Sequence, residues 1–128
     1  MSLLSRGTAG SIIGFSLLAL PGPAAAAPQP AASPGQAIYE RDCAHCHGVS
    51  GKGDGEESMY LTPPPQDFTT GILDKRSDDF LATVISKGGA AKGLSSSMPA
   101  APKLSQADVK NVVAYIRKLG KAPPKKTN

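Results

Sequence analysis

The chain has 128 residues and a formal charge of +4 at pH 7, from 14 Lys and Arg against 10 Asp and Glu. This length is enough for one domain, and a chain with 5% aromatic residues and no Trp has only a modest core. The basic residues form no stripe with interleaved aromatic residues, which excludes the usual pattern of a nucleic-acid-binding protein.

The N-terminal segment, residues 1–27, has the composition of a secretory signal peptide. Arg6 supplies the positive start, an apolar stretch follows, and the four alanines that begin at Ala24 offer cleavage sites of the small-residue type. The apolar stretch is shorter than the ~20 residues of a bilayer span, so an uncleaved membrane anchor is the weaker alternative. We predict cleavage near Ala26 or Ala27, a periplasmic location, and a mature form that does not span a membrane.

A first helix is predicted after a short disordered leader, residues 28–33. Ser33 is a suitable N-cap, Pro34 suits the first helical position, and Gln36 stands three residues after the cap, as in a capping box. The helix is expected to run into Cys43.

The stretch Cys43-Ala44-His45-Cys46-His47 is the most informative part of the chain. A C-x-x-C-H run is the attachment motif of a c-type haem, since each thiol can add to one haem vinyl group and the following His can bind the iron. Cys43 and Cys46 are the only cysteines, and His47 is one of only two histidines.

Three other interpretations of this run fit the sequence less well. A thioredoxin-like redox pair is expected after a strand in a βαβ unit, and no strand is predicted before Cys43. A zinc site needs four ligands, which five consecutive residues cannot easily supply around one ion. A structural disulfide is common in exported proteins, but His47 directly after the second Cys favours thioethers.

Long loops separate the predicted helices. Residues 48–58 contain four glycines, residues 59–70 contain the run Pro63 to Pro65, and residues 88–103 are again rich in Gly and Ser. Prolines in succession are excluded from a helix interior and a central strand. Loops of this length are unusual in a compact domain unless they are functional, and wrapping a haem is such a function.

Two further helices are predicted. One begins after Ser77 and ends at Gly88-Gly89, with apolar residues on one face; the last begins after Ser105, has Asp108 three residues later, and ends near Gly120. The apolar stripe of the last helix follows a period of 3.6 residues and consists of Val109, Val112, Val113, Ile116 and Leu119. No alternating strand pattern occurs, so we predict an all-α domain with three main helices.

From about residue 34 to residue 120 the chain resembles the class I cytochrome c family. The similarity is carried by Gly35 and Tyr39, the C-x-x-C-H-G run, the glycine-rich loop, the proline run, Met98-Pro99 and the last helix. The resemblance implies a class I cytochrome c fold around one covalently bound haem c, with the first and last helices crossing where Gly35 approaches Tyr115. It implies a cytochrome domain at residues 34–120; residues 121–128, with Lys121, Lys125 and Lys126, are a basic C-terminal tail.

The resemblance also assigns the haem site. Cys43 and Cys46 would carry the thioether bonds, and His47 would be the proximal iron ligand. The ring N–H of His47 would donate to a backbone carbonyl of Pro63, Pro64 or a close neighbour.

The sixth iron ligand has four candidates: Met98, Met59, His45 or none. His45 lies inside the attachment run, on the proximal side, and is expected to be an exposed spacer. Met59 precedes the proline segment and is expected to pack in the core. The resemblance favours Met98, which is followed by Pro99, so the expected ligand pair is His47 and Met98.

Filled coordination positions favour one-electron transfer and not catalysis, so the expected function is that of an electron carrier, not an enzyme. A neutral thioether raises the reduction potential. The partners of the carrier would be a dehydrogenase, oxidase or reductase, and the carrier itself is expected to be a monomer. Lys52, Lys92 and Lys103 are candidates for electrostatic steering toward those partners. The alternatives are a haem subunit of a stable complex and, less favoured, an open-site haem enzyme or sensor or a thiol–disulfide protein. We also expect a poorly folded apoprotein, because a buried haem would form a large part of the core.

Overall fold

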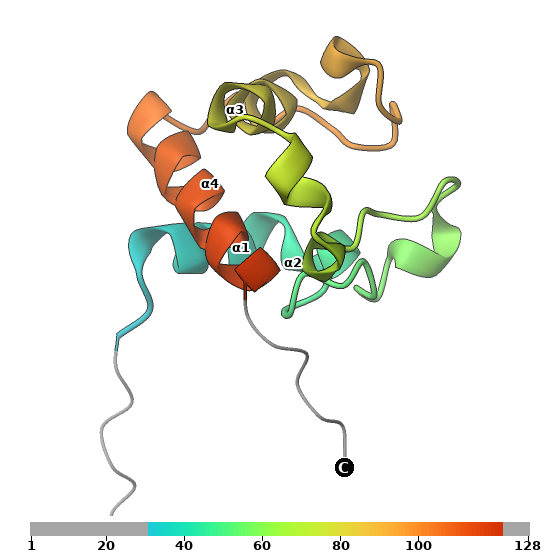
Figure 1. Ribbon diagram of the computed structural model, residues 1–128, viewed down its shortest axis with the longest axis horizontal. Helices are drawn as coiled ribbons and strands as arrows, with labels where there is room; N and C mark the ends of the chain where they lie inside the picture. The colour runs from blue at the N-terminus through green and yellow to red at the C-terminus, as the bar shows by residue number, and fades with distance from the viewer. Residues whose placement is uncertain (1–30, 122–128) are drawn as a thin grey trace, which may run out of the picture. The chain divides into compact units, whose positions relative to one another are not determined.

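A computed structural model describes residues 31–121, and the predicted signal peptide, half of the leader and nearly all of the basic tail lie outside this range. Within it the chain forms four α-helices and four short 3-10 helices, with no strand (Figure 1). The prediction of an all-α fold is confirmed. None of the helices in this range is long and apolar enough to cross a bilayer.

The first helix, α1 (Pro34–Asp42), begins as predicted. The Ser33 hydroxyl accepts a hydrogen bond from the Gln36 backbone N–H at 3.3 Å, and Pro34 occupies the first helical position. The capping box is only half formed, because the Gln36 side chain donates to Glu40 one turn later, at 2.8 Å. The next segment is a single-turn helix, α2 (Ala44–His47), which was not predicted.

The loop regions contain three 3-10 helices before the next long helix: η1 (Ser58–Tyr60), η2 (Phe68–Thr70) and η3 (Ile72–Lys75). The run from Pro63 to Pro65 lies outside all of them, as the missing N–H groups require. These short turns lead the chain from α2 to α3.

Helix α3 (Asp78–Lys87) has the predicted bounds. The Ser77 hydroxyl accepts from the Phe80 backbone N–H at 3.1 Å, which satisfies one of the unpaired donors of the first turn. Gly88 ends the helix, and η4 (Gly89–Lys92) follows directly.

The last helix, α4 (Gln106–Lys121), begins with a complete capping box. The Ser105 hydroxyl accepts from the Asp108 backbone N–H at 3.1 Å, and the Asp108 carboxylate accepts from the Ser105 backbone N–H at 3.0 Å. The helix passes through Gly120 to Lys121, one residue beyond the predicted end.

Helices α1 and α4 cross in close contact (Figure 1). A Cβ atom at Gly35 would collide with the backbone carbonyl of Asn111, so only glycine permits this distance between the two helices. The rings of Tyr39 and Tyr115 pack 5.3 Å apart at the crossing, and the buried Tyr39 hydroxyl donates to the Gly48 carbonyl at 2.7 Å. The close approach implied by the resemblance is confirmed.

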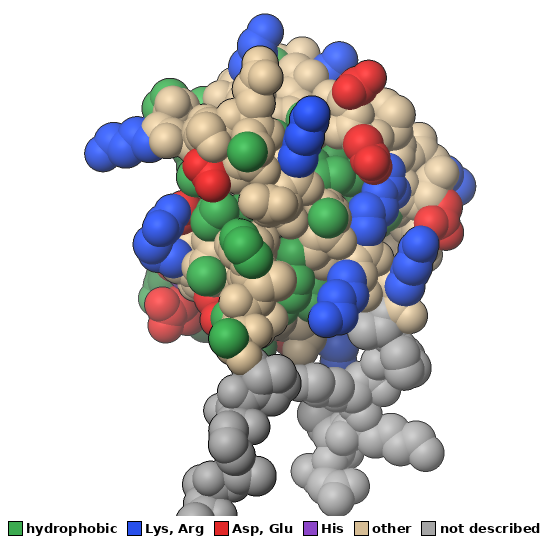
Figure 2. Space-filling model, turned by 90° about the vertical axis from the view of Figure 1, so that its left-hand side faces the viewer, with side chains coloured by type: hydrophobic (Ala, Val, Ile, Leu, Met, Phe, Trp, Pro, Cys, Tyr) green, Lys and Arg blue, Asp and Glu red, His purple; other side chains and the backbone are tan. Residues whose placement is uncertain are grey.

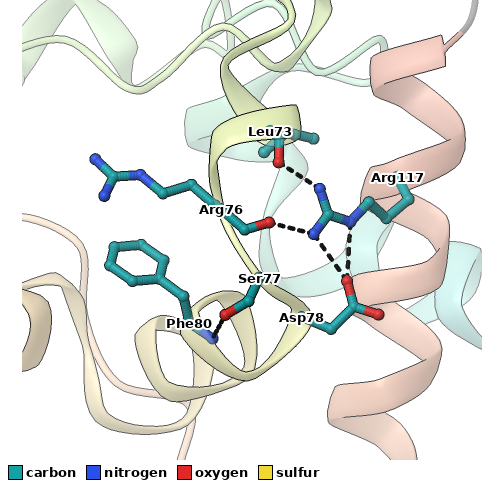
Figure 3. A network of polar contacts seen from close by, with 6 residues as sticks. All are labelled: Leu73, Arg76, Ser77, Asp78, Phe80 and Arg117. Carbon is teal, nitrogen blue, oxygen red and sulfur yellow. Dashed lines mark hydrogen bonds and ion pairs between the residues drawn. The ribbon is translucent and has the colours of Figure 1, made fainter.

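Arg117 on α4 holds the segment before α3 (Figure 3). Its guanidinium donates to the backbone carbonyls of Leu73 and Arg76 and to the Asp78 carboxylate, at 2.9 and 2.8 Å for the two Asp78 contacts. This arrangement fixes η3 and the start of α3 against α4, and with them one wall of the cavity described next.

Candidate functional site

A cavity of about 850 Å³ lies among these helices and loops. This volume is near the upper end of the range for small-molecule and cofactor sites. Cys43, Cys46, His47 and Met98 all line it. Apolar side chains supply most of its remaining wall, among them Ile38, Phe68, Leu73, Leu81, Val84 and Ile85.

The single turn of α2 directs the attachment run to the cavity. The backbone N–H groups of Cys46 and His47 both donate to the Cys43 carbonyl, at 3.2 and 2.9 Å. This tight turn lets all three side chains line one cavity, although they come from five consecutive residues.

The two cysteines are not joined by a disulfide, and both thiols have raised pKa values. Burial raises the pKa of Cys43 to about 11. Burial also raises the pKa of Cys46, and the Glu57 carboxylate, 3.6 Å from its sulfur, acts in the same direction. Catalytic redox cysteines have lowered pKa values, so these surroundings disfavour the thiol–disulfide interpretation.

His47 is oriented by two contacts. Its Nδ1 lies 3.3 Å from the backbone carbonyl of Gln66, and its ring stacks on Phe68 with the centroids 4.6 Å apart and an interplanar angle of 17°. Burial lowers the pKa of His47, while the Gln66 carbonyl acts in the opposite direction. A neutral imidazole that donates from Nδ1 keeps its Nε2 lone pair for a metal.

Met98 is half-buried in the loop between η4 and α4, residues 93–105, which we call the methionine loop. Its backbone is held at both ends, because its carbonyl accepts from the Gly89 N–H at 2.9 Å and its N–H donates to the Ser95 carbonyl at 3.3 Å. A Cβ atom at Gly89 would lie 3.0 Å from the Met98 Cβ and would collide with the Ser95 carbonyl. Glycine at this position therefore lets the methionine loop lie against the end of α3.

Met59 and His45 are the other two candidates for the sixth ligand. Met59 is on η1 with 77% of its surface exposed, so the expectation that it packs in the core is wrong, and it does not line the cavity. The prediction failed because an apolar residue next to a proline-rich loop need not be buried. His45 does line the cavity, with Nε2 4.0 Å from the Glu57 carboxylate.

The ligand atoms of His45, Cys46 and Glu57 lie within 4.8 Å of one another. Within the part of the chain that the structure describes they are the only such group of three, and no fourth donor completes a closed zinc site. Glu57 is also exposed. This cluster does not replace the C-x-x-C-H interpretation.

The residues around the cavity suit a covalently bound haem. Two uncharged thiols at C-x-x-C spacing, an oriented neutral imidazole and a thioether are the donor set of a His/Met c-type haem. The apolar wall suits a large flat macrocycle.

The family comparison agrees with a covalently bound haem. The family model described as "Cytochrome c" matches residues 32–120. The chain belongs to the cytochrome c family. It therefore carries a covalently bound haem c with its iron and takes part in haem-based electron transfer, and the family consists typically of electron carriers.

A relative of the cytochrome c family is also found among characterised proteins. Cytochrome c-554(547) of Halothiobacillus neapolitanus is 30% identical to this chain over 89 residues. The match covers 69% of this chain and 96% of the relative. The cytochrome domain of this chain is therefore similar to nearly the whole of that protein.

Sequence reasoning missed several residues of the site. The Gln66 carbonyl beside His47 belongs to a close neighbour of Pro63 and Pro64, as expected, but Phe68, which supplies the stacking surface, was not assigned to the site. The signal available was weak: Phe68 is the first aromatic residue after the prolines. Arg76 and Phe80 also line the cavity and were not assigned to it.

Proposed function

We propose that this cytochrome c is a one-electron carrier in which Cys43 and Cys46 bind the haem and His47 and Met98 are the axial ligands. The observation that carries the proposal is that all four side chains line one mostly apolar cavity. The bound haem supplies a one-electron iron couple.

The residues of the chain would hold that couple with little rearrangement. The Gln66 carbonyl and the Phe68 ring orient His47. The contact of Gly89 with the Met98 carbonyl holds the methionine loop. Two protein ligands leave no open position for a substrate, and a thioether ligand with apolar surroundings raises the reduction potential.

The domain organisation and location are part of the proposal. Residues 1–27 would be a cleaved signal peptide, 28–33 a leader, 34–120 the cytochrome domain and 121–128 a basic tail. Support comes from the composition of the N-terminus and from the helical boundaries within residues 31–121. The mature protein would be periplasmic.

The proposed partners are a dehydrogenase, oxidase or reductase, each met by a monomer. On the face drawn in Figure 2, Lys and Arg side chains stand apart from one another, with Asp and Glu among them. Lys92 and Lys103 are exposed, and Lys103 lines the cavity. Dispersed charge of this kind steers encounter and does not produce tight binding.

The alternative is a haem subunit of a stable complex. One observation favours it: Met59 and Tyr60 on η1 are 77% and 80% exposed. Two residues are a small part of the ~800 Å² that each partner contributes to a stable interface. We therefore favour a diffusing carrier.

The deciding experiment is an absorption spectrum of the oxidised and reduced protein, produced in a host that matures c-type cytochromes, together with haem staining of a denaturing gel. Haem that survives denaturation, a low-spin spectrum and the weak far-red band of ferric iron–thioether bonding are expected. Met98→Ala should keep the stained haem but lose the far-red band and lower the reduction potential. The control variant, Met59→Ala, should leave both the band and the potential unchanged.

Other outcomes would overturn parts of the proposal. Stained haem without the far-red band in the unchanged protein would indicate an open-site enzyme or sensor. Loss of the band in Met59→Ala but not in Met98→Ala would make Met59 the ligand. An unstained protein would show that Cys43 and Cys46 do not bind haem, and it would favour a role for them as free thiols.

A further inference from the structure

Haem c brings two propionate carboxylates into its site, and these need cationic or hydrogen-bonding partners where they leave water. Among the described residues that line the cavity, three are basic: Arg41, Arg76 and Lys103. The three side chains differ in whether an acidic side chain already pairs with their positive charge.

Arg41 is engaged by its neighbour. Its Nε and Nη2 donate to the two Asp42 oxygens at 2.7 and 2.6 Å, and this hydrogen bonding lowers the pKa of the Asp42 carboxyl. Arg41 also stands two residues before Cys43, beside the edge of the haem that the thioethers would hold. Propionates lie on the other edge of the macrocycle from the vinyl-derived carbons, so Arg41 is poorly situated to reach them.

Arg76 has no acidic side chain within ion-pairing distance in the part of the chain that the structure describes. Its guanidinium carbon lies over the Phe80 ring, 4.4 Å from the centroid. Because stacking on a ring uses the face of the guanidinium, the N–H groups at its edge remain available to a carboxylate. Lys92 lies near the same ring, with its Nζ 5.7 Å from the centroid, and adds to the positive potential there.

The backbone of Arg76 is held from behind. Arg117 donates to its carbonyl and to the Asp78 carboxylate two residues later, and the Arg76 N–H donates to the Leu73 carbonyl at 3.1 Å. Figure 3 shows the Arg76 side chain extending away from Arg117 and along Phe80. Arg76 is exposed, but hydrogen bonds hold its backbone, and its guanidinium lies on Phe80 at the cavity.

We propose that Arg76 binds a haem propionate through the edge of its guanidinium, with Phe80 as the surface on which it stacks. The proposal rests on the haem being seated between His47 and Met98, as proposed above. An arginine in this place has an electrostatic effect as well as a structural one. Its positive charge opposes the ferric state and keeps the propionate ionised.

The test is the midpoint potential as a function of pH, measured on the holoprotein with Arg76→Gln, Arg76→Lys and two control variants. Arg76→Gln should lower the potential, because a positive charge near the iron is lost. The expected change is about tenfold in the ferric-to-ferrous ratio, or about 59 mV for a one-electron couple. Without the cation the propionate pKa rises, so the potential should also begin to fall with rising pH nearer to neutrality.

A merely structural role would not produce this pH dependence. Arg76→Lys keeps the charge and should restore most of the potential and the flat profile near neutral pH. Redox-difference infrared spectra should show a shifted propionate carboxylate band in Arg76→Gln. The two controls are Lys103→Gln, which removes the other cationic side chain at the cavity that has no acidic partner, and Lys87→Gln, which removes an exposed charge on α3. Both should leave the infrared band and the pH profile of the potential unchanged.

The outcomes are separable from those of the proposed function. Haem staining and the far-red band report whether the haem and its ligands are in place in each variant. If these are intact and Arg76→Gln leaves the potential, its pH profile and the infrared band unchanged, the assignment of Arg76 is wrong. If Lys103→Gln produces the changes instead, Lys103 is the propionate partner.

Discussion

The neighbours of His47 orient its ring and favour the neutral imidazole, the form that binds a metal. The Gln66 carbonyl stands at Nδ1, Phe68 covers one face of the ring, and burial lowers the pKa. These are the contacts that set the tautomer and orientation of metal-binding histidines generally. Met98 depends instead on its backbone, which is held against Gly89.

At the residue scale we predict that Gly89→Ala weakens the bond between Met98 and iron. The new Cβ would collide with the Ser95 carbonyl and press on the Met98 Cβ, which would displace the loop. Overpacking of this kind costs about 1–3 kcal/mol. The far-red band should weaken and external ligands such as imidazole should bind more tightly, while gel haem staining is unchanged.

Gly93→Ala is the control for this prediction. Gly93 has a positive φ, 69°, which Gly89 does not have, and a Cβ there would meet nothing within 4 Å. Gly93→Ala therefore introduces backbone strain next to η4 without a collision with the loop that carries Met98. Equal loss of the far-red band in both variants would show that a general disturbance of this segment, and not contact with Met98, is responsible.

At the scale of the elements, polar contacts at helix ends hold the cavity wall. Ser33, Ser77 and Ser105 cap three helices, and Arg117 ties η3 and the start of α3 to α4. The capping serines were recognisable because capping acts over three or four residues. The contacts of Arg117 cross about forty residues of chain, so no local pattern predicts them.

Replacing Arg117 should destabilise this wall. Arg117→Gln would remove the donor to the Arg76 carbonyl and one of the two donors to the Leu73 carbonyl, and the loss of these two hydrogen bonds costs about 1–3 kcal/mol. The Asp78 side chain is 74% exposed, so its ion pair contributes little of this. Chemical denaturation of the holoprotein measures the loss, and Lys118→Gln, the neighbouring exposed residue, should show less than half of it.

The capping box of α4 predicts an acid-dependent contribution to stability. The hydrogen bonds from Ser105 lower the pKa of the Asp108 carboxyl below its unfolded value. A carboxyl with a lowered folded pKa adds stability that is complete above the unfolded value and is lost as pH falls through the folded one. Asp108→Asn should therefore lower Tm at pH 7, and the difference from the unchanged protein should shrink below about pH 4.

Glu56→Gln is the control for the Asp108 variant. Glu56 is an exposed carboxylate in the loop before η1 and takes no part in helix capping. Its variant should leave Tm unchanged at both pH values. A difference for Asp108→Asn that stays constant from pH 7 to pH 3 would contradict the role of its charge.

At the scale of the whole molecule, the cavity lies where a small domain would otherwise place core side chains. Its volume of about 850 Å³ is far larger than the voids of ordinary protein interiors. The largest fully buried side chains among the described residues, Tyr39 and Val112, both belong to the contact between α1 and α4. We therefore expect the haem to be the main element that joins α3 and the methionine loop to the rest.

The apoprotein should accordingly lose most of its cooperative structure. The double variant Cys43→Ala/Cys46→Ala, or the unchanged chain from a host without haem attachment, should show reduced helical circular dichroism and no sharp unfolding transition. The holoprotein is the reference. An apoprotein that unfolds cooperatively at the Tm of the holoprotein would contradict this prediction.

Much of the fold followed from local patterns. The period of the apolar residues on α4 and the capping serines predicted the helices, and the family resemblance implied their contact at Gly35. The single turn of α2 and the short 3-10 helices were missed, since they have too few residues to show a period. Met59 was misjudged for a related reason, because burial of one apolar residue in a loop has no local signal.

The cofactor chemistry and the helical class could be predicted from the sequence, because attachment spacing and helical periodicity are properties of neighbouring residues. The packed fold was needed to find that Gln66 and Phe68 flank His47, that Arg117 holds the Arg76 backbone, and that Arg76 lies over Phe80 at the cavity. These contacts join segments far apart in the chain, and they form only when the helices pack and bring those segments together.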